Sequence, residues 1–229
     1  MAWLDFLRPK RPTLQHIVRD APPLPPVRQP APEPAPISGP DEVYTLQDPK
    51  AFYAAVRAIT GRLDQAQVDT IERLLKGAAH WPVPWLAYGL ATAWHEARLK
   101  PIAEWGKGRG RPYAKRGKYG QSQYGRGLVQ LTWDANYEKA DKALGLGGAL
   151  LRDFDLALDP DIAARILVWG MEMGAFTGRR LSDCIRGDVG RHNDFIAARA
   201  IINGKDKAAL IADYAERFQA ALWAGKWKD

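Results

Sequence analysis

The chain has 229 residues, of which 46% are hydrophobic, and a formal net charge of +7. This length and apolar content suffice for one well-buried core in one or two domains, and no stretch approaches the roughly 20 apolar residues of a transmembrane helix. Cys184 is the only cysteine, which excludes an intrachain disulfide and fits synthesis in the reducing cytosol.

The first forty residues hold eleven of the seventeen prolines. Because prolines at this density favour an extended, semi-rigid chain, we expect residues 1–40 to form a disordered tether and residues 41–229 to form the folded domain. The apolar segment 1–7 precedes the charges of Arg8, Lys10 and Arg11, an order that is wrong for a signal peptide. This tip is either disordered or a weak surface anchor through residues 1–11.

Helical periodicity dominates the rest of the chain. Asp48 followed by Pro49 is typical of a helix start, and apolar residues then recur at helical spacing. We expect helices over 48–59, 64–75, 84–98, 134–144, 159–174 and 206–223. Strand patterns are confined to short pieces near the glycine-rich loop that follows Gly106, and no internal repeat occurs. The sequence thus predicts a mainly α, compact helical domain with a short irregular or β-like segment near that loop.

Two glutamates form a candidate acid pair. Glu96 lies at the end of the helix predicted over 84–98, and Pro101 disfavours helix at Lys100, so the chain bends before Glu104. Unbroken helix would hold the two carboxylates about 12 Å apart, whereas a bent chain can bring Glu104 back towards Glu96. Glycosidases that invert the anomeric centre need roughly 6.5–9.5 Å between their carboxyl groups.

The surroundings of the two glutamates predict different roles. Trp94 and nearby alanines give Glu96 an apolar setting, which keeps a carboxylic acid protonated and able to donate a proton. Cations favour an ionised carboxylate at Glu104, and three lie near it in the sequence: Lys100, Lys107 and Arg109. The alternative is that Glu96 caps or salt-bridges a helix and that Glu104 is a solvated loop charge.

Several motifs occur in a fixed order around this pair. They are Trp94-His-Glu96, Pro101-Ile-Ala-Glu104, Tyr124-Gly-Arg-Gly-Leu-Val-Gln-Leu-Thr-Trp133 with Asn136-Tyr137, Gly174-Ala-Phe-Thr-Gly178 and Ala198-Arg-Ala-Ile-Ile-Asn-Gly204. Together they resemble glycoside hydrolase family 19, the chitinases and phage or bacterial endolysins, from about residue 63 to 223. The resemblance implies a lysozyme-like helical fold, a family 19-like catalytic domain over 41–229, and no metal or cofactor.

The resemblance also implies a role for each matched position. Glu96 is the general acid, Glu104 the general base, and Thr132 holds the attacking water. The remaining matched residues are expected to bind substrate: His95, Tyr124, Arg126, Gln130, Asn136 and Asn203. Two departures stand out, because Ala97 replaces the Thr of many family members and a long Gly/Arg/Lys loop joins Glu104 to Tyr124.

Simpler explanations stay open for several positions. Thr132 could cap the helix expected over 134–144, Asn203 before Gly204 could form an ordinary helix-terminal turn, and His95 could be a packing residue. Four tryptophans are candidates either for the core or for stacking on sugar rings: Trp81, Trp85, Trp94 and Trp133.

Charge favours one substrate within the family. Residues 98–126 hold nine Lys or Arg and one acid, a local charge of +8. A basic rim attracts anionic polymers, so we expect cleavage of the β-1,4 bonds of peptidoglycan, with neutral chitin or another N-acetylglucosamine-containing glycan as the alternative. We expect a monomeric phage or prophage lysin, made in the cytoplasm and reaching the wall through a holin or in a virion.

Three rival functions are weaker. The loop from Gly106 to Pro112, with its neighbouring tyrosines, interleaves cations and aromatic rings as single-strand nucleic-acid binders do, but the acid pair argues against a nucleic-acid partner. A non-catalytic wall-binding module would keep the fold without the chemistry. A zinc amidase is disfavoured because the four histidines show no paired ligand spacing.

Overall fold

The computed structural model describes residues 46–227. The predicted tether over 1–40 and the predicted domain start at Asp41 lie outside the described residues. The helices that carry the core are α2 (Pro49–Thr60), α3 (Gln65–Gly77), α4 (Val83–Ala97), α5 (Asp134–Ala143), α7 (Pro160–Met173) and α10 (Ala208–Ala224). The mainly helical fold with a short β segment beside the glycine-rich loop is confirmed.

The local signals for helix starts are confirmed in detail. Asp48 caps α2 by accepting a hydrogen bond from the Ala51 N–H at 2.9 Å, and Pro49 is the first helical residue. Asp64 and Gln67 form a reciprocal capping box at the start of α3. The last helix begins at Ala208, two residues later than predicted.

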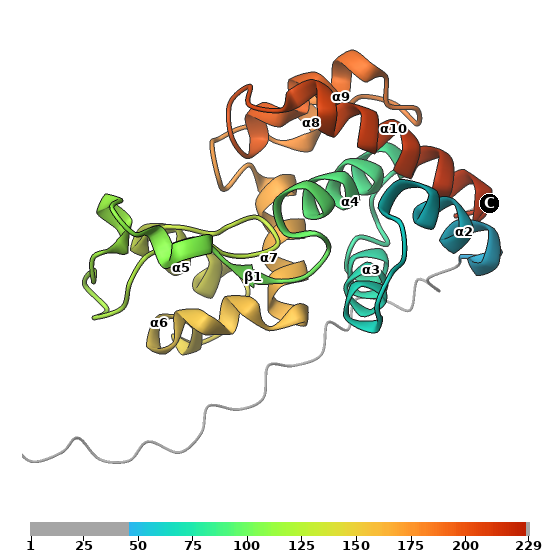
Figure 1. The fold of residues 1–229 in the computed structure, drawn as a ribbon. Helices are drawn as coiled ribbons and strands as arrows, with labels where there is room; N and C mark the ends of the chain where they lie inside the picture. Colours follow the sequence, from blue (N-terminus) through green and yellow to red (C-terminus); the bar gives the residue numbers. More distant parts are fainter. Residues whose placement is uncertain (1–45, 228–229) are drawn as a thin grey trace, which may run out of the picture. The chain divides into compact units, whose positions relative to one another are not determined.

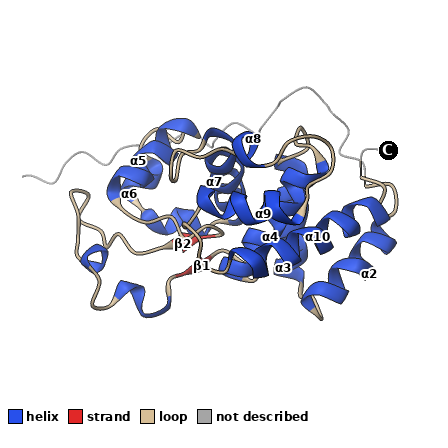
Figure 2. Cartoon of the chain, turned by 90° about the horizontal axis from the view of Figure 1, so that it is seen from above, coloured by secondary structure: helices blue, strands red, loops and turns tan. Residues whose placement is uncertain are grey.

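Helix α4 is the centre of the core. Nearly all of its residues from Leu86 to Ala93 are buried, and α10 packs along it while also contacting α2 and α9 (His192–Ala198). Helix α3 packs on α7. Figures 1 and 2 both show α4 and α7 between α2 on one side and the pair α5 and α6 (Ala149–Arg152) on the other.

The short elements build the region around the site. The strands β1 (Ile102–Ala103) and β2 (Arg126–Gly127) pair antiparallel, with Ile102 opposite Gly127. Between them lie two 3₁₀ turns, η1 (Trp105–Gly108) and η2 (Pro112–Ala114). Three more short elements complete the chain: η3 (Phe154–Leu158), α8 (Leu181–Cys184) and η4 (Arg199–Ile201). Sequence patterns predicted the short β segment but not the 3₁₀ turns or α8, which are too short for a period to show.

The chain reverses direction after α4 earlier than predicted. The helix ends at Ala97, and Arg98 and Leu99 both adopt left-handed backbone angles, with φ of 52° and 57°. The Leu99 N–H donates to the Ala93 carbonyl at 3.0 Å, which closes the helix end. The bend that carries the chain from Glu96 towards Glu104 is therefore made by Arg98 and Leu99, before the chain reaches Pro101.

No helix within residues 46–227 is long and apolar enough to cross a membrane.

Candidate active site

Glu96 lies on the last turn of α4 with a charged partner. Its Oε1 accepts a hydrogen bond from Nη1 of Arg199 at 2.6 Å, and the Glu96 side chain is 19% exposed. The apolar setting predicted for this carboxyl group is therefore wrong: the alanines of α4 face the core, while the carboxyl group meets a guanidinium. Among residues 46–227, no hydrogen bond reaches Oε2 of Glu96, so this oxygen is free to face a substrate.

Arg199 connects Glu96 to the loop that follows η4. The arginine side chain is only 1% exposed, and its Nε donates to the Asp206 carbonyl at 2.8 Å while Nη1 holds Glu96. Asn203 lies in this loop, is exposed, and donates its backbone N–H to the Arg199 carbonyl at 3.0 Å. Asn203 therefore lies in the turn that begins at Arg199, the residue that binds Glu96, and this turn agrees with the one expected from Asn203 before Gly204.

His95 precedes Glu96 and is half-buried. Burial lowers the pKa of His95, and the Glu96 carboxylate only partly opposes this effect. The neutral imidazole is therefore favoured near neutral pH, which suits hydrogen bonding or packing better than binding an anion.

Glu104 is oriented by two donors. The Tyr113 hydroxyl donates to Oε1 at 2.8 Å and the Gly125 N–H donates to Oε2 at 3.1 Å, while the Glu104 N–H donates to the Gly125 carbonyl at 2.7 Å. Glu104 also raises the pKa of Tyr113 through this hydrogen bond, so the phenol stays protonated and keeps donating. Of the cations predicted around Glu104, Lys100 instead pairs with Asp64.

Two glycines allow this arrangement. A Cβ on Gly108 would come within 2.7 Å of the Tyr113 ring, and a Cβ on Gly125 would lie 2.9 Å from Oε1 of Gln130 and 3.3 Å from Oγ1 of Thr132. A side chain at Gly108 would displace the Tyr113 ring, and one at Gly125 would displace Gln130 and crowd Thr132. Gly125 therefore leaves room for the Thr132 hydroxyl beside the backbone segment that binds the Glu104 carboxylate.

Three predicted site residues follow Gly125 in the chain: Thr132, expected to hold the water, and Gln130 and Asn136, expected to bind substrate. Thr132 donates to the Gln130 carbonyl at 2.8 Å, and Asn136 donates its amide to the Thr132 carbonyl at 2.8 Å. The Gln130 amide bonds to the carbonyls of Ile102 and Gly127 across the small sheet. The idea that Thr132 caps the following helix is wrong, because α5 begins after Trp133 without any side-chain cap.

Tyr124 and Arg126 lie inside the protein. Arg126 is 4% exposed, its guanidinium carbon lies 3.6 Å from the Tyr124 ring centroid, and its Nε pairs with Asp155 at 2.6 Å. Its Nη1 donates to three oxygens of neighbouring residues, including the Tyr137 hydroxyl. These contacts give both residues a structural role beneath the site, and their contact with substrate stays a prediction.

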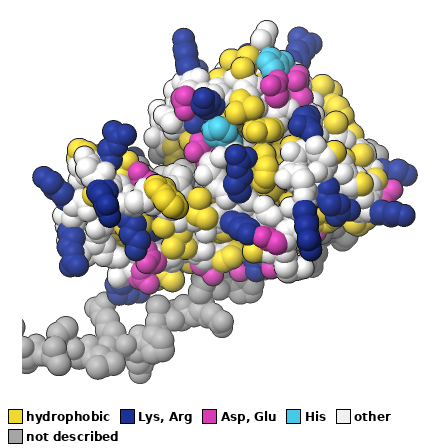
Figure 3. Space-filling view, viewed as in Figure 1, with side chains coloured by type: hydrophobic (Ala, Val, Ile, Leu, Met, Phe, Trp, Pro, Cys, Tyr) yellow, Lys and Arg dark blue, Asp and Glu magenta, His cyan; other side chains and the backbone are white. Residues whose placement is uncertain are grey.

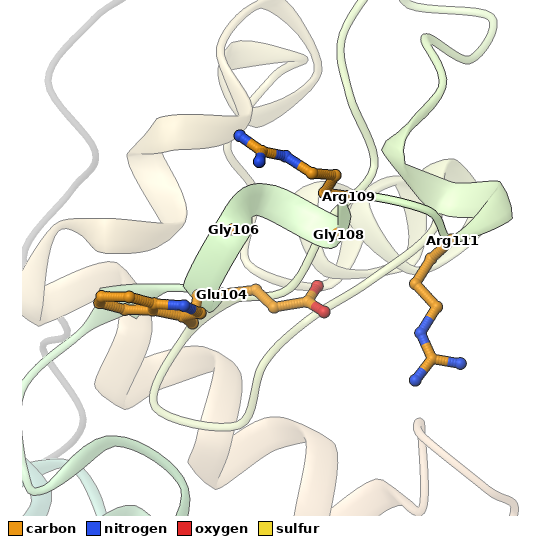
Figure 4. A pocket seen from close by; sticks show the side chains of 6 residues that line it. Glu104, Gly106, Gly108, Arg109 and Arg111 are labelled. Carbon is orange, nitrogen blue, oxygen red and sulfur yellow. The ribbon is translucent and has the colours of Figure 1, made fainter.

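An open hollow of about 630 Å³ adjoins Glu104. It is lined by Glu104, Trp105, Gly106, Gly108, Arg109 and Arg111 (Figure 4). Trp105 is 98% exposed, whereas Trp81 is buried at 1% and Trp133 is 44% exposed. Sequence analysis missed Trp105; the available signal was its position beside Glu104 in a glycine-rich loop that offers it no helical partner. An exposed indole beside a carboxylate can stack on a sugar ring.

No protein-family model matches the chain. A stretch of 47 residues is 47% identical to the acidic endochitinase pcht28 of Solanum chilense and 45% identical to the acidic 26 kDa endochitinase of Solanum lycopersicum. The predicted resemblance to chitinases is confirmed in this stretch. It covers 20% of this chain and 19% of each relative, so the chain matches about a fifth of their length.

Two solved structures are also similar. A bacterial family 19 chitinase aligns with a TM-score of 0.38 and 21% identity, over 75% of this chain and 83% of its own. Chitinase C from Streptomyces griseus aligns with a TM-score of 0.42 and 21% identity, over 78% and 86%.

One group within the described residues has metal-ligand chemistry. His192 at the start of α9 faces Asp213 and Glu216 of α10, with Nδ1 of the histidine 3.1 Å from Oε2 of Glu216 and 3.8 Å from Oδ1 of Asp213. All three side chains are at least 40% exposed, and His192, when protonated, forms an ion pair with each of the two carboxylates. The group shares no contact with Glu96 or Glu104, and its members are too far apart in the sequence to form a recognisable motif.

Proposed function

We propose that this chain is a glycoside hydrolase that cleaves β-1,4 bonds next to N-acetylated sugars by an inverting mechanism. The arrangement of the two glutamates carries the proposal. Each carboxylate accepts hydrogen bonds from residues elsewhere in the chain. Arg199 donates to Glu96, and Tyr113 and Gly125 donate to Glu104. The endochitinases that share the 47-residue stretch support the same class of substrate.

Glu96 acts as the general acid in this proposal. The assignment rests on the Trp94-His-Glu96 motif, because a guanidinium takes the place of the expected apolar setting. Arg199 fixes one carboxyl oxygen and leaves Oε2 open towards the leaving glycosidic oxygen. Because Arg199 is buried and bound at two points, the carboxyl group is held in one orientation. The sugar that leaves would be bound partly by the loop that carries Asn203.

Glu104 acts as the general base on the opposite face of the sugar ring. Tyr113 and Gly125 hold the carboxylate, and the Thr132 hydroxyl also lies beside Gly125, 3.3 Å from where a Cβ on that glycine would be. A water between Glu104 and Thr132 would be activated by the carboxylate and oriented by the hydroxyl, as the single-displacement route requires.

The basic loop favours an anionic glycan such as peptidoglycan over neutral chitin. Lys107, Arg109, Arg111, Lys115 and Arg116 are exposed and form no ion pair within residues 46–227, whereas Lys118 pairs with Glu138. Figure 3 shows Lys and Arg side chains standing out from the part of the surface where Figure 1 shows the loops after Glu104. These free cations would concentrate an acidic polymer at the site.

The test is digestion of purified peptidoglycan by wild type and by Glu96→Gln, followed by mass spectrometry of the products. The wild type should release muropeptides with new reducing ends, and the variant should lose about 10²–10⁴-fold in rate. Because Glu96→Gln removes the charge that faces the buried Arg199, its melting temperature should fall, so both proteins are assayed at a temperature at which circular dichroism shows the variant folded. A variant that retains more than about a tenth of wild-type turnover would remove Glu96 from the mechanism. Release of chitin fragments with intact peptidoglycan would favour the chitinase alternative.

A further inference from the structure

Two arginines of the basic loop differ in their position relative to Glu104. Arg109 and Arg111 both line the hollow, and both are exposed. Figure 4 shows the Arg111 side chain on the same side of the Gly106–Gly108 turn as the Glu104 carboxylate, while Arg109 extends from the other side. Both arginines thus border the hollow, and Arg111 is the one on the Glu104 side of the turn.

Electrostatics agree with this placement. The charge of Arg111 lowers the pKa of Tyr113 against the larger raising effect of Glu104, so the guanidinium lies within electrostatic reach of the hydroxyl that binds the base. Arg109 has no such effect on Tyr113. The backbone of Arg111 is held in the loop, because its N–H donates to the Gly108 carbonyl at 2.8 Å and its carbonyl accepts from the Ala114 N–H at 3.1 Å.

An exposed arginine without an acidic partner within residues 46–227, in the same hollow as the proposed general base, is suited to bind an anion on the substrate. A substrate carboxylate near Glu104 would otherwise be repelled by the like charge of Glu104. The planar guanidinium offsets this repulsion and can bind a carboxylate through two parallel hydrogen bonds.

We propose that Arg111 binds a carboxylate of an acidic aminosugar unit in the hollow beside Glu104. This inference rests on the proposed function and specifies its substrate: the acidic sugar, rather than any stretch of the polymer, is recognised next to the general base. Two carboxylates could serve, the lactyl group of an N-acetylmuramic acid ring or a carboxylate of the peptide attached to it.

Arg109→Gln is a matched control for Arg111→Gln, because both remove one charge from the same loop and both side chains line the same hollow. Steady-state kinetics would be measured on three substrates: a peptide-free tetrasaccharide of alternating N-acetylglucosamine and N-acetylmuramic acid, its peptide-bearing form, and chitotetraose. Arg111→Gln should raise KM about three- to tenfold on an acidic substrate, with kcat little changed and chitotetraose unaffected. Arg109→Gln removes the same charge, and so the same share of the general attraction; it should raise KM on the acidic substrates clearly less than Arg111→Gln does and leave chitotetraose unaffected.

The substrates and variants separate the outcomes. An effect on the peptide-free tetrasaccharide identifies the lactyl carboxylate, and an effect only on the peptide-bearing form identifies the peptide. Equal effects of the two variants, or an equal loss on chitotetraose, would overturn the assignment of Arg111 while leaving the hydrolase activity intact. A wild type that cleaves none of the three would contradict the proposed function. In that case, binding of the same three oligosaccharides measured by calorimetry, with the same contrast between variants, still decides the role of Arg111.

Discussion

Arg199→Lys tests whether the buried guanidinium positions Glu96. Lysine keeps the charge but cannot reach both Glu96 and the Asp206 carbonyl with the fixed geometry of Nη1 and Nε. Removing one partner of a buried ion pair costs about 3–5 kcal/mol of stability. Because Glu96 is 19% exposed and lysine retains the charge, we expect a smaller loss, about 1–3 kcal/mol.

The assay combines urea unfolding with turnover for four proteins: wild type, Arg199→Lys, Glu96→Gln and the double variant. If Arg199 acts through Glu96, the effect of Arg199→Lys on kcat should nearly vanish in the Glu96→Gln background, with a coupling of about 0.5–3 kcal/mol. Wild-type kcat in a folded Arg199→Lys variant, or a full and additive loss in the double variant, would refute the reasoning.

Two further predictions concern neighbouring residues. Trp105→Ala should raise KM about equally for neutral and acidic oligosaccharides without changing the melting temperature, because the 98% exposed indole stacks on sugar and is not part of the core. Trp105→Phe should restore part of the affinity, and an unchanged KM in Trp105→Ala would exclude stacking. Because burial lowers the pKa of His95 from its ordinary value of 6.5, the unfolded chain binds more protons as pH falls through that range. The wild type should therefore lose unfolding free energy below about pH 6.5 more steeply than His95→Gln, and parallel curves would contradict this.

The fold could be predicted where sequence signals are local. Asp48, Pro49 and Asp64 mark helix starts because capping needs only residues within one turn, and α4 and α10 show their apolar faces in their periodicity. The short helices α8 and α9 and the 3₁₀ turns could not be predicted, because four to seven residues are held by tertiary contacts rather than by a period of their own.

The site could be predicted only in part. Glu96, Glu104 and Thr132 were singled out by motif and by chemistry, and the structure brings Glu104 and Thr132 together through Gly125. The partner of Glu96 could not be read from spacing, since Arg199 lies 103 residues away and meets it only through the packing of the folded chain. Trp105 and Arg111 owe their roles to the path of a loop, which depends on the Tyr113 ring lying against Gly108.

The stereochemistry of hydrolysis tests the central claim most directly. Proton NMR of a fresh digest of a β-linked oligosaccharide by the wild type would follow the anomeric signals of the new reducing end. A water held between Glu104 and Thr132 attacks from the face opposite the leaving group, so the α-anomer should appear first and the β-anomer should follow by mutarotation. Immediate appearance of the β-anomer would mean retention through a covalent intermediate, and would contradict the assignment of Glu104 as the general base.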